Sequence, residues 1–441
     1  MDFRFKVDDK PSFGATLLYG LQWLMICIPV VLTSTFIAPE GEMVFFTQKL
    51  FVICGITIII QVLCGHRLPL VAGPAAVLLM GVIAAKDQGF TDSTIYPSMI
   101  IGGALVTLLA AVGAMKYIQK IFTPRIVAAI VILISFTMAK PILGLIFPMK
   151  SIEVEGFSVS VLQHPEHALL AFLMMILGVA IMAWANNIFK GIWKSTVVIL
   201  AMILGAIFYY AMTDFPTEFV CDSKAPQIIL TEFSLDAGVI IAFLFCYIAL
   251  LINQVGSVQS LGDFVGAANM GKRQNRGLLI TGVMNMVSGA MGVPGPVDYS
   301  LSPGVVASTS CASRYTMLPA AVAMIVLAIF PDAVAVLLTI PKPIMGIVLL
   351  YLMATQVAAG LEIIHSSKAV LSFRDGLILG IPIMLTLILS FVPDGAMDSV
   401  PSLLRPIVGN GFVMGIIVVL ILEHLVLRSK TKSEKREKAE N

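Results

Sequence analysis

The sequence predicts an all-α protein that crosses a membrane many times, and three observations support this fold class. Hydrophobic residues make up 58% of the 441 residues, charged residues make up 12%, and the mean hydropathy is +0.97. Apolar runs of about 20 residues, enough for a helix to cross a bilayer, recur along the chain. Two of these runs are interrupted by Gly and Pro at matching places in the two halves, which is typical of inverted-repeat transporters.

The apolar runs divide into fourteen expected spans, seven in each half. The first repeat covers residues 14–212 and the second covers residues 237–427, with an acidic exterior loop, residues 213–236, between them. An N-terminal segment, residues 1–13, and a charged tail, residues 428–441, flank the repeats. In chain order the spans are expected near Gly14 to Ile37, Leu50 to Gly65, Leu68 to Ala85, Tyr96 to Met115, Pro124 to Phe147, His167 to Asn186, Trp193 to Met212, Ala237 to Ser257, Gly277 to Gly292, Met291 to Arg314, Met317 to Phe330, Pro343 to Gly360, Gly376 to Val392 and Gly411 to Leu427.

The third and tenth spans are expected to be broken by short extended stretches. Gly73-Pro74 and Ser302-Pro303 each place a small or capping residue before a proline, which is typical of the first turn of a helix. Val297 to Ser300 are expected to be extended before the second of these helices. Irregular backbone at membrane depth is tolerated only where protein buries it or a watery cavity adjoins it. We therefore expect both breaks to line the binding site.

Polar side chains inside the apolar helices are the candidate ligand contacts. Asn253 and Ser257 lie four residues apart at the end of the eighth span and share one helix face, and Gln254 adds a second amide. These groups either bind a ligand or form hydrogen bonds between helices. Gln22 and Trp23 in the first span are likewise either a pair that faces the cavity or groups that pack helices together.

A planar heterocycle is the kind of ligand that suits such groups. An amide offers both a donor and an acceptor without the cost of a buried charge. Aromatic and apolar side chains give a ring a stacking surface, and backbone N–H groups at helix starts attract carbonyl oxygens or an anion. The residues expected to contribute are Trp23, Tyr299 and Leu301 for stacking, and Gly73, Ala75 and Ser302 at the starts of the two half-helices.

Asp298 is the clearest carboxylate in the second break and is our candidate proton-coupling residue. Burial disfavours the charged form of a carboxylate, which suits a group that loads and releases a proton during transport. The alternative is that Asp298 lies on the outward rim, stays ionised and only caps backbone N–H groups.

Loop charges predict that both termini lie in the cytoplasm of a bacterial-type plasma (inner) membrane. Most of the 28 Lys and Arg residues fall in the two termini and in the loops on the same side, as the positive-inside rule requires. The six cysteines show no CxxC pair, and His164 and His167 are expected to be solvated loop residues. No catalytic residue, metal site or cofactor is expected, because no reactive groups converge at membrane depth.

Several motifs, in order along nearly the whole chain, resemble the nucleobase/ascorbate transporter family, which includes the bacterial uracil and xanthine permeases. The resemblance implies two inverted seven-span repeats. Spans one to four and eight to eleven would form a core domain, the other spans would form a gate that is often dimeric, and a base would bind between the two. The motifs are GLQW in span one, PLVAGPA in span three, PRIVA in span five, NQVGS in span eight, RGLLITGVMNMVSGAMG in span nine, and SPGVVAST followed by SCASR in span ten.

The chain also departs from this family at the positions thought to grip the base and to couple proton entry. Family members usually carry a glutamate where this chain has Asn253, and a histidine or aspartate where it has Ser257. They usually carry a glutamate or glutamine, then an asparagine, where this chain has Leu301 and Ser302, and commonly a histidine at the position of Trp23. The resemblance therefore implies the fold without fixing the substrate or the coupling ion.

The expected function is a permease for nucleobases such as uracil, xanthine or urate, which works by alternating access with proton coupling left open. The alternatives are an anion carrier or channel, or a non-transporting receptor, on the same fold. The expected partners are a small heterocycle, a proton or another cation, the lipid bilayer and a second copy of the chain, with no nucleic acid. The sequence does not choose the base, the coupling ion or the direction of transport.

Overall fold

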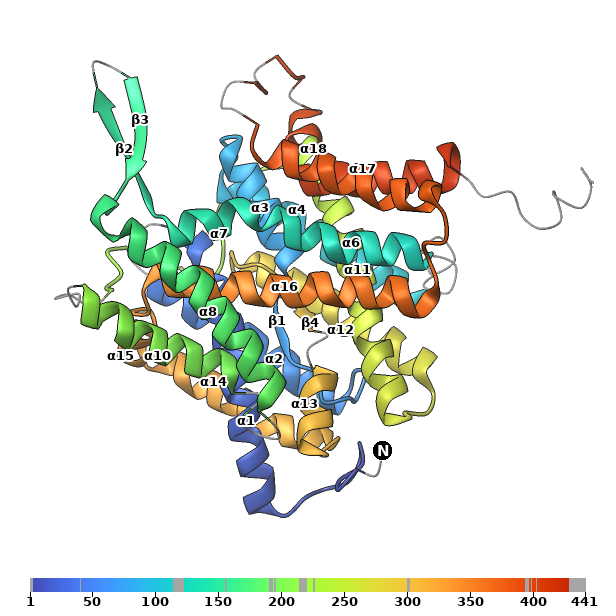
Figure 1. The fold of residues 1–441 in the computed structure, drawn as a ribbon. Coiled ribbons are helices and arrows are strands. Elements are labelled where there is room, and N and C mark those ends of the chain that lie inside the picture. The colour runs from blue at the N-terminus through green and yellow to red at the C-terminus, as the bar shows by residue number, and fades with distance from the viewer. Residues whose placement is uncertain are drawn as a thin grey trace, which may run out of the picture.

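The computed structural model describes most of the chain as helices around two short strands (Figure 1). The described residues are 3–39, 41–113, 123–154, 157–189, 193, 196–213, 220–224, 227–299, 302–392, 396–397, 399–401 and 403–427. Leu301 and the tail, residues 428–441, lie outside this part of the chain, and the expected roles of both stay predictions.

The elements of each half follow the expected order of apolar runs. In the first half they are α1 (Phe13–Leu32), η1 (Thr35–Ile37), α2 (Met43–Leu63), β1 (Ala72–Pro74), α3 (Ala76–Asp87), α4 (Asp92–Ala111), α6 (Pro124–Thr137), α7 (Ala139–Ile146), β2 (Met149–Val154), β3 (Phe157–Leu162), η2 (Pro165–His167), α8 (Ala168–Ile188) and α10 (Val197–Met212). In the second half they are α11 (Ala237–Val265), α12 (Met270–Ala290), β4 (Pro296–Asp298), α13 (Ser302–Thr309), η3 (Arg314–Thr316), α14 (Met317–Ile329), α15 (Pro331–Leu337), α16 (Lys342–Ser367), α17 (Phe373–Ser390), α18 (Arg405–Val408), α19 (Gly411–Ile421) and η4 (Leu422–Val426).

The helical membrane fold is confirmed. Among the described residues, eight helices are long and apolar enough to cross a membrane, and there are nine if α14 and α15, which meet at a bend of 104°, form one span. This count does not establish fourteen spans or two inverted repeats, and both stay predictions. The antiparallel hairpin of β2 and β3 was not expected, and it projects from the helices in Figure 1.

Two expected helix boundaries, in the eighth and the third spans, are wrong. The eighth span does not end near Ser257, because α11 continues to Val265 and stops where Gly266 adopts the left-handed conformation (φ 65°) that commonly ends a helix. The fifth span keeps its expected bounds, because α6 and α7, which meet at Met138, together form one apolar stretch long enough to cross a membrane, Pro124–Ile146. The half-helix of the third span begins at Ala76, because Pro74, the expected first helical residue, belongs to β1.

The helices pack in two groups. In one group α4 packs against α12 and α11, α2 against α14, and α1 against α14. In the other α16 packs against α6, α7 and α8, and α17 packs against α6 and α19. Small residues allow the closest approaches: a Cβ atom at Gly103 of α4 would lie 2.9 Å from the carbonyl oxygen of Gly282 in α12. The strands β1 and β4 lie in the middle of the molecule (Figure 1).

A glycine substitution tests the packing of α4 against α11. A Cβ atom at Gly102 would lie 2.1 Å from the Tyr247 ring, whose hydroxyl donates to the Met99 carbonyl oxygen at 2.9 Å. Gly102→Ala should therefore destabilise the protein by about 1 to 3 kcal/mol through overpacking. Gly144→Ala is the matched control, since no atom lies within 4 Å of its added Cβ. Thermal unfolding in detergent measures both, and equal midpoints would contradict the packing described here.

Candidate functional site

The two predicted breaks meet as an antiparallel pair of strands. Ala72 pairs with Asp298, Gly73 with Val297 and Pro74 with Pro296. The pairing is extended at both ends, because Ala75 N donates to Gly295 O at 2.9 Å and Tyr299 N donates to Val71 O at 2.8 Å. Backbone groups buried away from water must find partners within the protein. Each break supplies the partners of the other, which explains how both persist inside an apolar bundle.

Ser302 joins the strands instead of capping its own helix as predicted. Its hydroxyl accepts from Val71 N at 3.0 Å and donates to Tyr299 O at 3.2 Å. A capping residue precedes the first residue of its helix, so the prediction requires α13 to begin at Pro303. The helix instead begins at Ser302 itself. The hydroxyl therefore holds the end of β4 against the chain that enters β1.

Asp298 points to a buried cluster on α11 and the turn after α2. The carboxylate atom Oδ2 accepts from Gln254 Nε2, and Gln254 Oε1 accepts from Asp298 N at 2.9 Å. His66 Nε2 lies 3.1 Å from the same oxygen, and the side chains of His66 and Asp298 are 0% and 1% exposed. The expectation that Asp298 lies on an outward rim is wrong, because an exposed rim does not bury a carboxylate to this extent.

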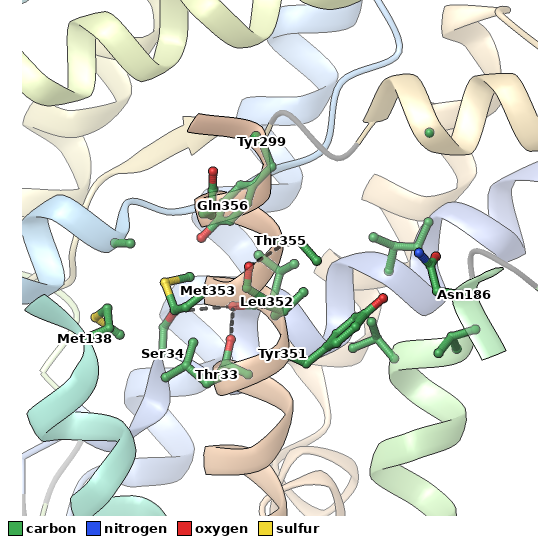
Figure 2. Close-up of a pocket in the computed structure, with 18 of the residues that line it drawn as sticks. Thr33, Ser34, Met138, Asn186, Tyr299, Tyr351, Leu352, Met353, Thr355 and Gln356 are labelled. Atoms are coloured by element: carbon green, nitrogen blue, oxygen red, sulfur yellow. Dashed lines mark hydrogen bonds between the residues drawn. The ribbon is translucent and has the colours of Figure 1, made fainter. Parts of the chain in front are cut away.

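A cavity of about 260 Å³ lies beside the break. Its wall comes from α1, from the starts of α3 and α13, and from α8, α10 and α16, so it lies between the two groups of helices. This volume is close to the lower end of the roughly 300–1,000 Å³ of small-molecule pockets, which favours a small ligand. Figure 2 shows the labelled polar side chains around this space, which are Thr33, Ser34, Asn186, Tyr299, Tyr351, Thr355 and Gln356.

The polar side chains that line the cavity differ in how many of their hydrogen-bond donors and acceptors already have a partner. Thr33 and Ser34 donate to the Val30 carbonyl oxygen at 3.1 and 3.3 Å, so their oxygen atoms stay open as acceptors. The amides of Asn186 and Gln356 form no hydrogen bond with the described residues. The cavity therefore offers acceptor oxygens at the end of α1 and complete amide groups from α8 and α16.

The predicted contacts fall at different distances from this cavity. Tyr299 lines it, and its hydroxyl donates to Pro74 O at 2.6 Å. Gly73 lies directly behind, since a Cβ atom there would be 3.0 Å from the Tyr299 ring. Ala75 is the capping residue of α3 and is fully buried beside the lining residue Ala76.

The pair in the first span, Gln22 and Trp23, is buried within the helices. The indole Nε1 of Trp23 donates to Thr316 Oγ1 at 3.1 Å, and its ring is buried between α1 and the start of α14. Gln22 is also buried. Neither side chain is among the residues that line the cavity in the described structure.

Asn253 and Ser257 lie on α11, which packs against β4 and α13. Asn253 is half-buried, and its amide forms no hydrogen bond with the described residues. The Ser257 hydroxyl is buried and has no partner among them. A buried polar atom without a partner is uncommon in proteins and indicates a place for water or for a ligand.

Residues 14–395 match the sequence model of the xanthine and uracil permeases, which is described as the permease family. The chain belongs to this permease family. It is an integral membrane protein of that family, with several apolar helices long enough to cross a bilayer.

Relatives of the permease are similar along almost its full length. A Clostridium perfringens protein named as a purine permease, CPE0397, is 25% identical over 98% of this chain and 94% of its own. The xanthine permease of Bacillus subtilis is 22% identical over 97% of both chains. The uric acid transporter UacT of Escherichia coli is 20% identical over 95% of this chain and 87% of its own.

Solved structures share the fold of the permease. The transmembrane domain of the cyanobacterial bicarbonate transporter BicA gives a TM-score of 0.61 at 16% identity and covers 87% of this chain and 98% of its own. Murine Slc26a9 in an inward-facing state gives a TM-score of 0.57 at 12% identity and covers 93% of this chain and 68% of its own. At these identities the likeness concerns the fold alone.

Sequence reasoning missed two parts of the site. His66 closes an apolar run and is followed by Arg67, so it reads as an ordinary span end, although the structure buries it completely. Thr355 and Gln356 stand side by side within the apolar run of α16 and line the cavity. A pair of polar residues in the middle of a long apolar helix was a signal that could have identified them.

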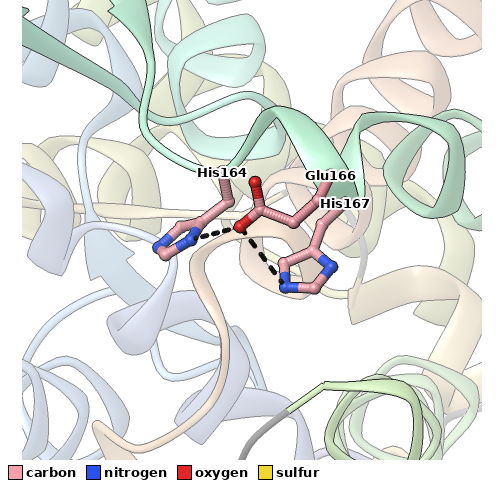
Figure 3. A group of neighbouring side chains, drawn as sticks. All are labelled: His164, Glu166 and His167. Carbon is pink, nitrogen blue, oxygen red and sulfur yellow. Dashed lines mark hydrogen bonds and ion pairs between the residues drawn. The ribbon is translucent and has the colours of Figure 1, made fainter.

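The permease also carries a group of possible metal-binding type on its surface. His164, Glu166 and His167 lie together at the start of α8, and their ligand atoms are all within 4.8 Å of one another (Figure 3). Their side chains are 52%, 59% and 32% exposed, and Glu166 Oε1 lies 3.1 Å from His164 Nδ1. Ion pairing of the Glu166 carboxylate with the two exposed imidazoles accounts for this arrangement.

The bonds of Ser302 give a testable prediction. Ser302→Ala should destabilise the permease by about 1 to 3 kcal/mol, because Val71 N and Tyr299 O would each lose a partner in a buried place. The control is Ser366→Ala, which removes an exposed hydroxyl that donates within its own helix, to Ile363 O. Chemical unfolding in detergent compares the two variants. If both lose equally little stability, the hydroxyl does not hold the strands together.

Proposed function

We propose that the permease carries a planar heterocycle of nucleobase type across the membrane by alternating access. The observation that supports this proposal is the position of the cavity between the two groups of helices, where Tyr299 from the break and Gln356 from α16 both line it. A site between two rigid groups is exposed to one side or the other when the groups move against each other. We name the groups the core (α1 to α4, α11 to α14) and the gate (α6 to α10, α16 to α19).

The pattern of helix contacts supports two inverted seven-span repeats. We pair the helices of the two halves as α1 with α11, α2 with α12, α4 with α14, α6 with α16, α8 with α17 and α10 with α19. Under this exchange the contact of α2 with α14 becomes that of α12 with α4, and the contact of α1 with α14 becomes that of α11 with α4. In the gate, α17 with α6 becomes α8 with α16, and α10 with α16 becomes α19 with α6. A contact map that is preserved by exchanging the halves is what an internal two-fold repeat predicts.

The chemistry of the surroundings favours a neutral or anionic base. The half-helices α3 and α13 begin at the cavity wall, where their N–H groups favour carbonyl oxygens or an anion. A Cβ atom on Gly304 would meet nothing within 4 Å, so there is open space beside the first turn of α13. The unbonded amide of Asn253 and the unbonded hydroxyl of Ser257 lie on α11, which packs against β4 and α13. An oxo-purine or a pyrimidinedione presents the matching carbonyl and ring N–H groups.

The names of the relatives agree with this substrate class, since they are purine, xanthine and uracil permeases and a uric acid transporter. We therefore place xanthine, uric acid and uracil in the first panel of probes. We further propose that both termini lie in the cytoplasm of a bacterial inner membrane, since the positive charge gathers in the loops on that side. The gate would carry any dimer contact, because many apolar side chains of α8 and α10 are exposed.

Counterflow exchange in proteoliposomes tests the proposed function. Vesicles with purified permease are loaded with unlabelled xanthine, uric acid or uracil, and the entry of the same labelled compound is followed at equal pH on both sides. A carrier should show saturable entry that needs the internal compound. Entry without saturation would indicate a channel, and binding without entry would indicate a receptor, so either result would contradict the proposal.

Asn253 gives the sharpest variant for the binding site. Asn253→Ala removes an amide that we expect to bond the base, and affinity should fall by about 1 to 3 kcal/mol. Ser260→Ala, an exposed position on the same helix, is the control. Ligand-induced thermal stabilisation by the compound that exchanges best measures affinity in both proteins. Unchanged affinity in folded Asn253→Ala protein would limit this residue to helix packing.

A further inference from the structure

The group of His164, Glu166 and His167 brings together side chains that can bind a metal ion. All three point toward one another, and the Glu166 carboxylate lies between the two imidazole rings (Figure 3). Glu166 Oε1 lies 3.1 Å from His164 Nδ1 and 3.9 Å from His167 Nε2. Two imidazole nitrogens and one carboxylate oxygen are ligands that Zn²⁺ uses in proteins, with water in the fourth position. The ion pairs therefore hold in one place three groups that a divalent cation can bind.

The local backbone explains why the two imidazoles approach each other. His164 directly precedes the short helix η2, and His167 is its last residue. Side chains three residues apart lie almost above one another in a 3₁₀-helix, which has three residues per turn. The two ring centroids are accordingly 5.7 Å apart. The turn thus presents both imidazoles on one side, and the Glu166 side chain reaches between them (Figure 3).

The distances are close to those of a tetrahedral site. Bonds of about 2.0 to 2.2 Å from Zn²⁺ to nitrogen and oxygen place neighbouring ligand atoms roughly 3.3 to 3.5 Å apart. The two measured separations, 3.1 and 3.9 Å, lie on either side of this range. All three side chains are partly exposed, so small rotations about their own bonds can complete the geometry without repacking the core. Imidazole ligands also favour zinc-type cations over Mg²⁺ and Ca²⁺, which prefer oxygen ligands.

The position of the group indicates what a bound cation would do. The strands β2 and β3 form a two-stranded sheet, and such a hairpin is only marginally stable by itself in water. The pairing is extended by one bond, from Gln163 N to Pro148 O at 2.8 Å, and His164 is the next residue. Glu166 and His167 directly precede α8. A cation held by all three side chains would therefore restrict the turn through which the hairpin joins α8.

We propose that the permease binds a divalent cation of zinc type through His164 Nδ1, the Glu166 carboxylate and His167 Nε2, and that this cation fixes the turn between the β2–β3 hairpin and α8. The neutral imidazoles supply lone pairs, the carboxylate supplies negative charge, and water completes the coordination. Since α6 and α7 lead away from the face that we propose to be cytoplasmic, the site would lie on the outer face. Cation binding involves no transported compound, so this proposal does not depend on the proposed function.

Calorimetric titration of ZnCl₂ into the full-length permease tests the site. The protein carries no histidine tag, and Cys64→Ser and Cys221→Ser remove the exposed thiols, which are themselves possible zinc ligands. This parent protein should bind one Zn²⁺ per chain, and excess Mg²⁺ should not displace it.

Three variants of this parent identify the ligands. Loss of a group that merely orients a ligand often costs about 10- to 100-fold in affinity, so loss of a ligand should cost at least about tenfold. His167→Ala and Glu166→Gln should both show this loss. His365→Ala, which removes an exposed imidazole on α16, is the matched control and should bind Zn²⁺ like the parent. The unfolding midpoint without metal should be the same in all of them, because each side chain is at least partly exposed.

Hydrogen exchange followed by mass spectrometry tests the effect on the turn. Amide groups of β2, β3 and η2 should exchange more slowly when Zn²⁺ is present, in the parent and in His365→Ala but not in His167→Ala. Slower exchange reports that the bound cation stabilises the local structure against opening.

The outcomes separate the two parts of the proposal. No zinc binding by the parent, or equal affinity in the parent and in His167→Ala or Glu166→Gln, indicates an adventitious ion only and overturns the site. Affinity that falls as expected, with no change in exchange at β2, β3 and η2, overturns the fixing of the turn and leaves the site in place. The counterflow experiment decides the proposed function separately, because neither measurement here uses a transported compound.

Discussion

The antiparallel pairing of β1 with β4 is the constraint on which the rest of the site depends. Two strands of three residues each, far apart in sequence, satisfy each other's backbone groups at a depth where water cannot. Neither break could exist alone, since its N–H and C=O groups would be left without partners. Because the two are held together, the starts of α3 and α13, the Tyr299 ring and the Asp298 carboxylate have fixed places relative to one another.

The positions of the breaks could be predicted from local sequence, whereas their pairing could not. Gly and Pro exclude a continuous helix at Gly73-Pro74 and at Pro296, so the extended stretches follow from backbone chemistry alone. The partner of Ser302 is Val71, more than two hundred residues earlier, and no local pattern specifies such a contact. A capping position was therefore the best local expectation for Ser302, and the tertiary contact replaced it.

The candidate site was half predictable for a similar reason. Spacing placed Asn253 and Ser257 on one face of α11. Gln254 lies about 100° around the helix from Asn253, so its amide reaches Asp298 and not the region that Asn253 faces. His66 was missed because a residue at the end of a span is buried only if a distant part of the chain packs over it. Here that part is α12, which carries Arg273, and the strand that carries Asp298. Polar residues of α16 were hidden within a run whose average is strongly apolar.

The geometry of a strand explains why a buried carboxylate and a ring that lines the cavity can share so short a segment. Successive side chains of a strand point to opposite faces, so Asp298 and Tyr299 must face opposite ways. One meets His66 and Gln254, and the other lines the cavity and donates to Pro74 O across the strand pair. A helix at this place would turn adjacent residues by only about 100° and would bring the carboxylate closer to the cavity. The strand therefore keeps the Asp298 carboxylate away from the cavity that Tyr299 lines, while the shared backbone still connects the two side chains.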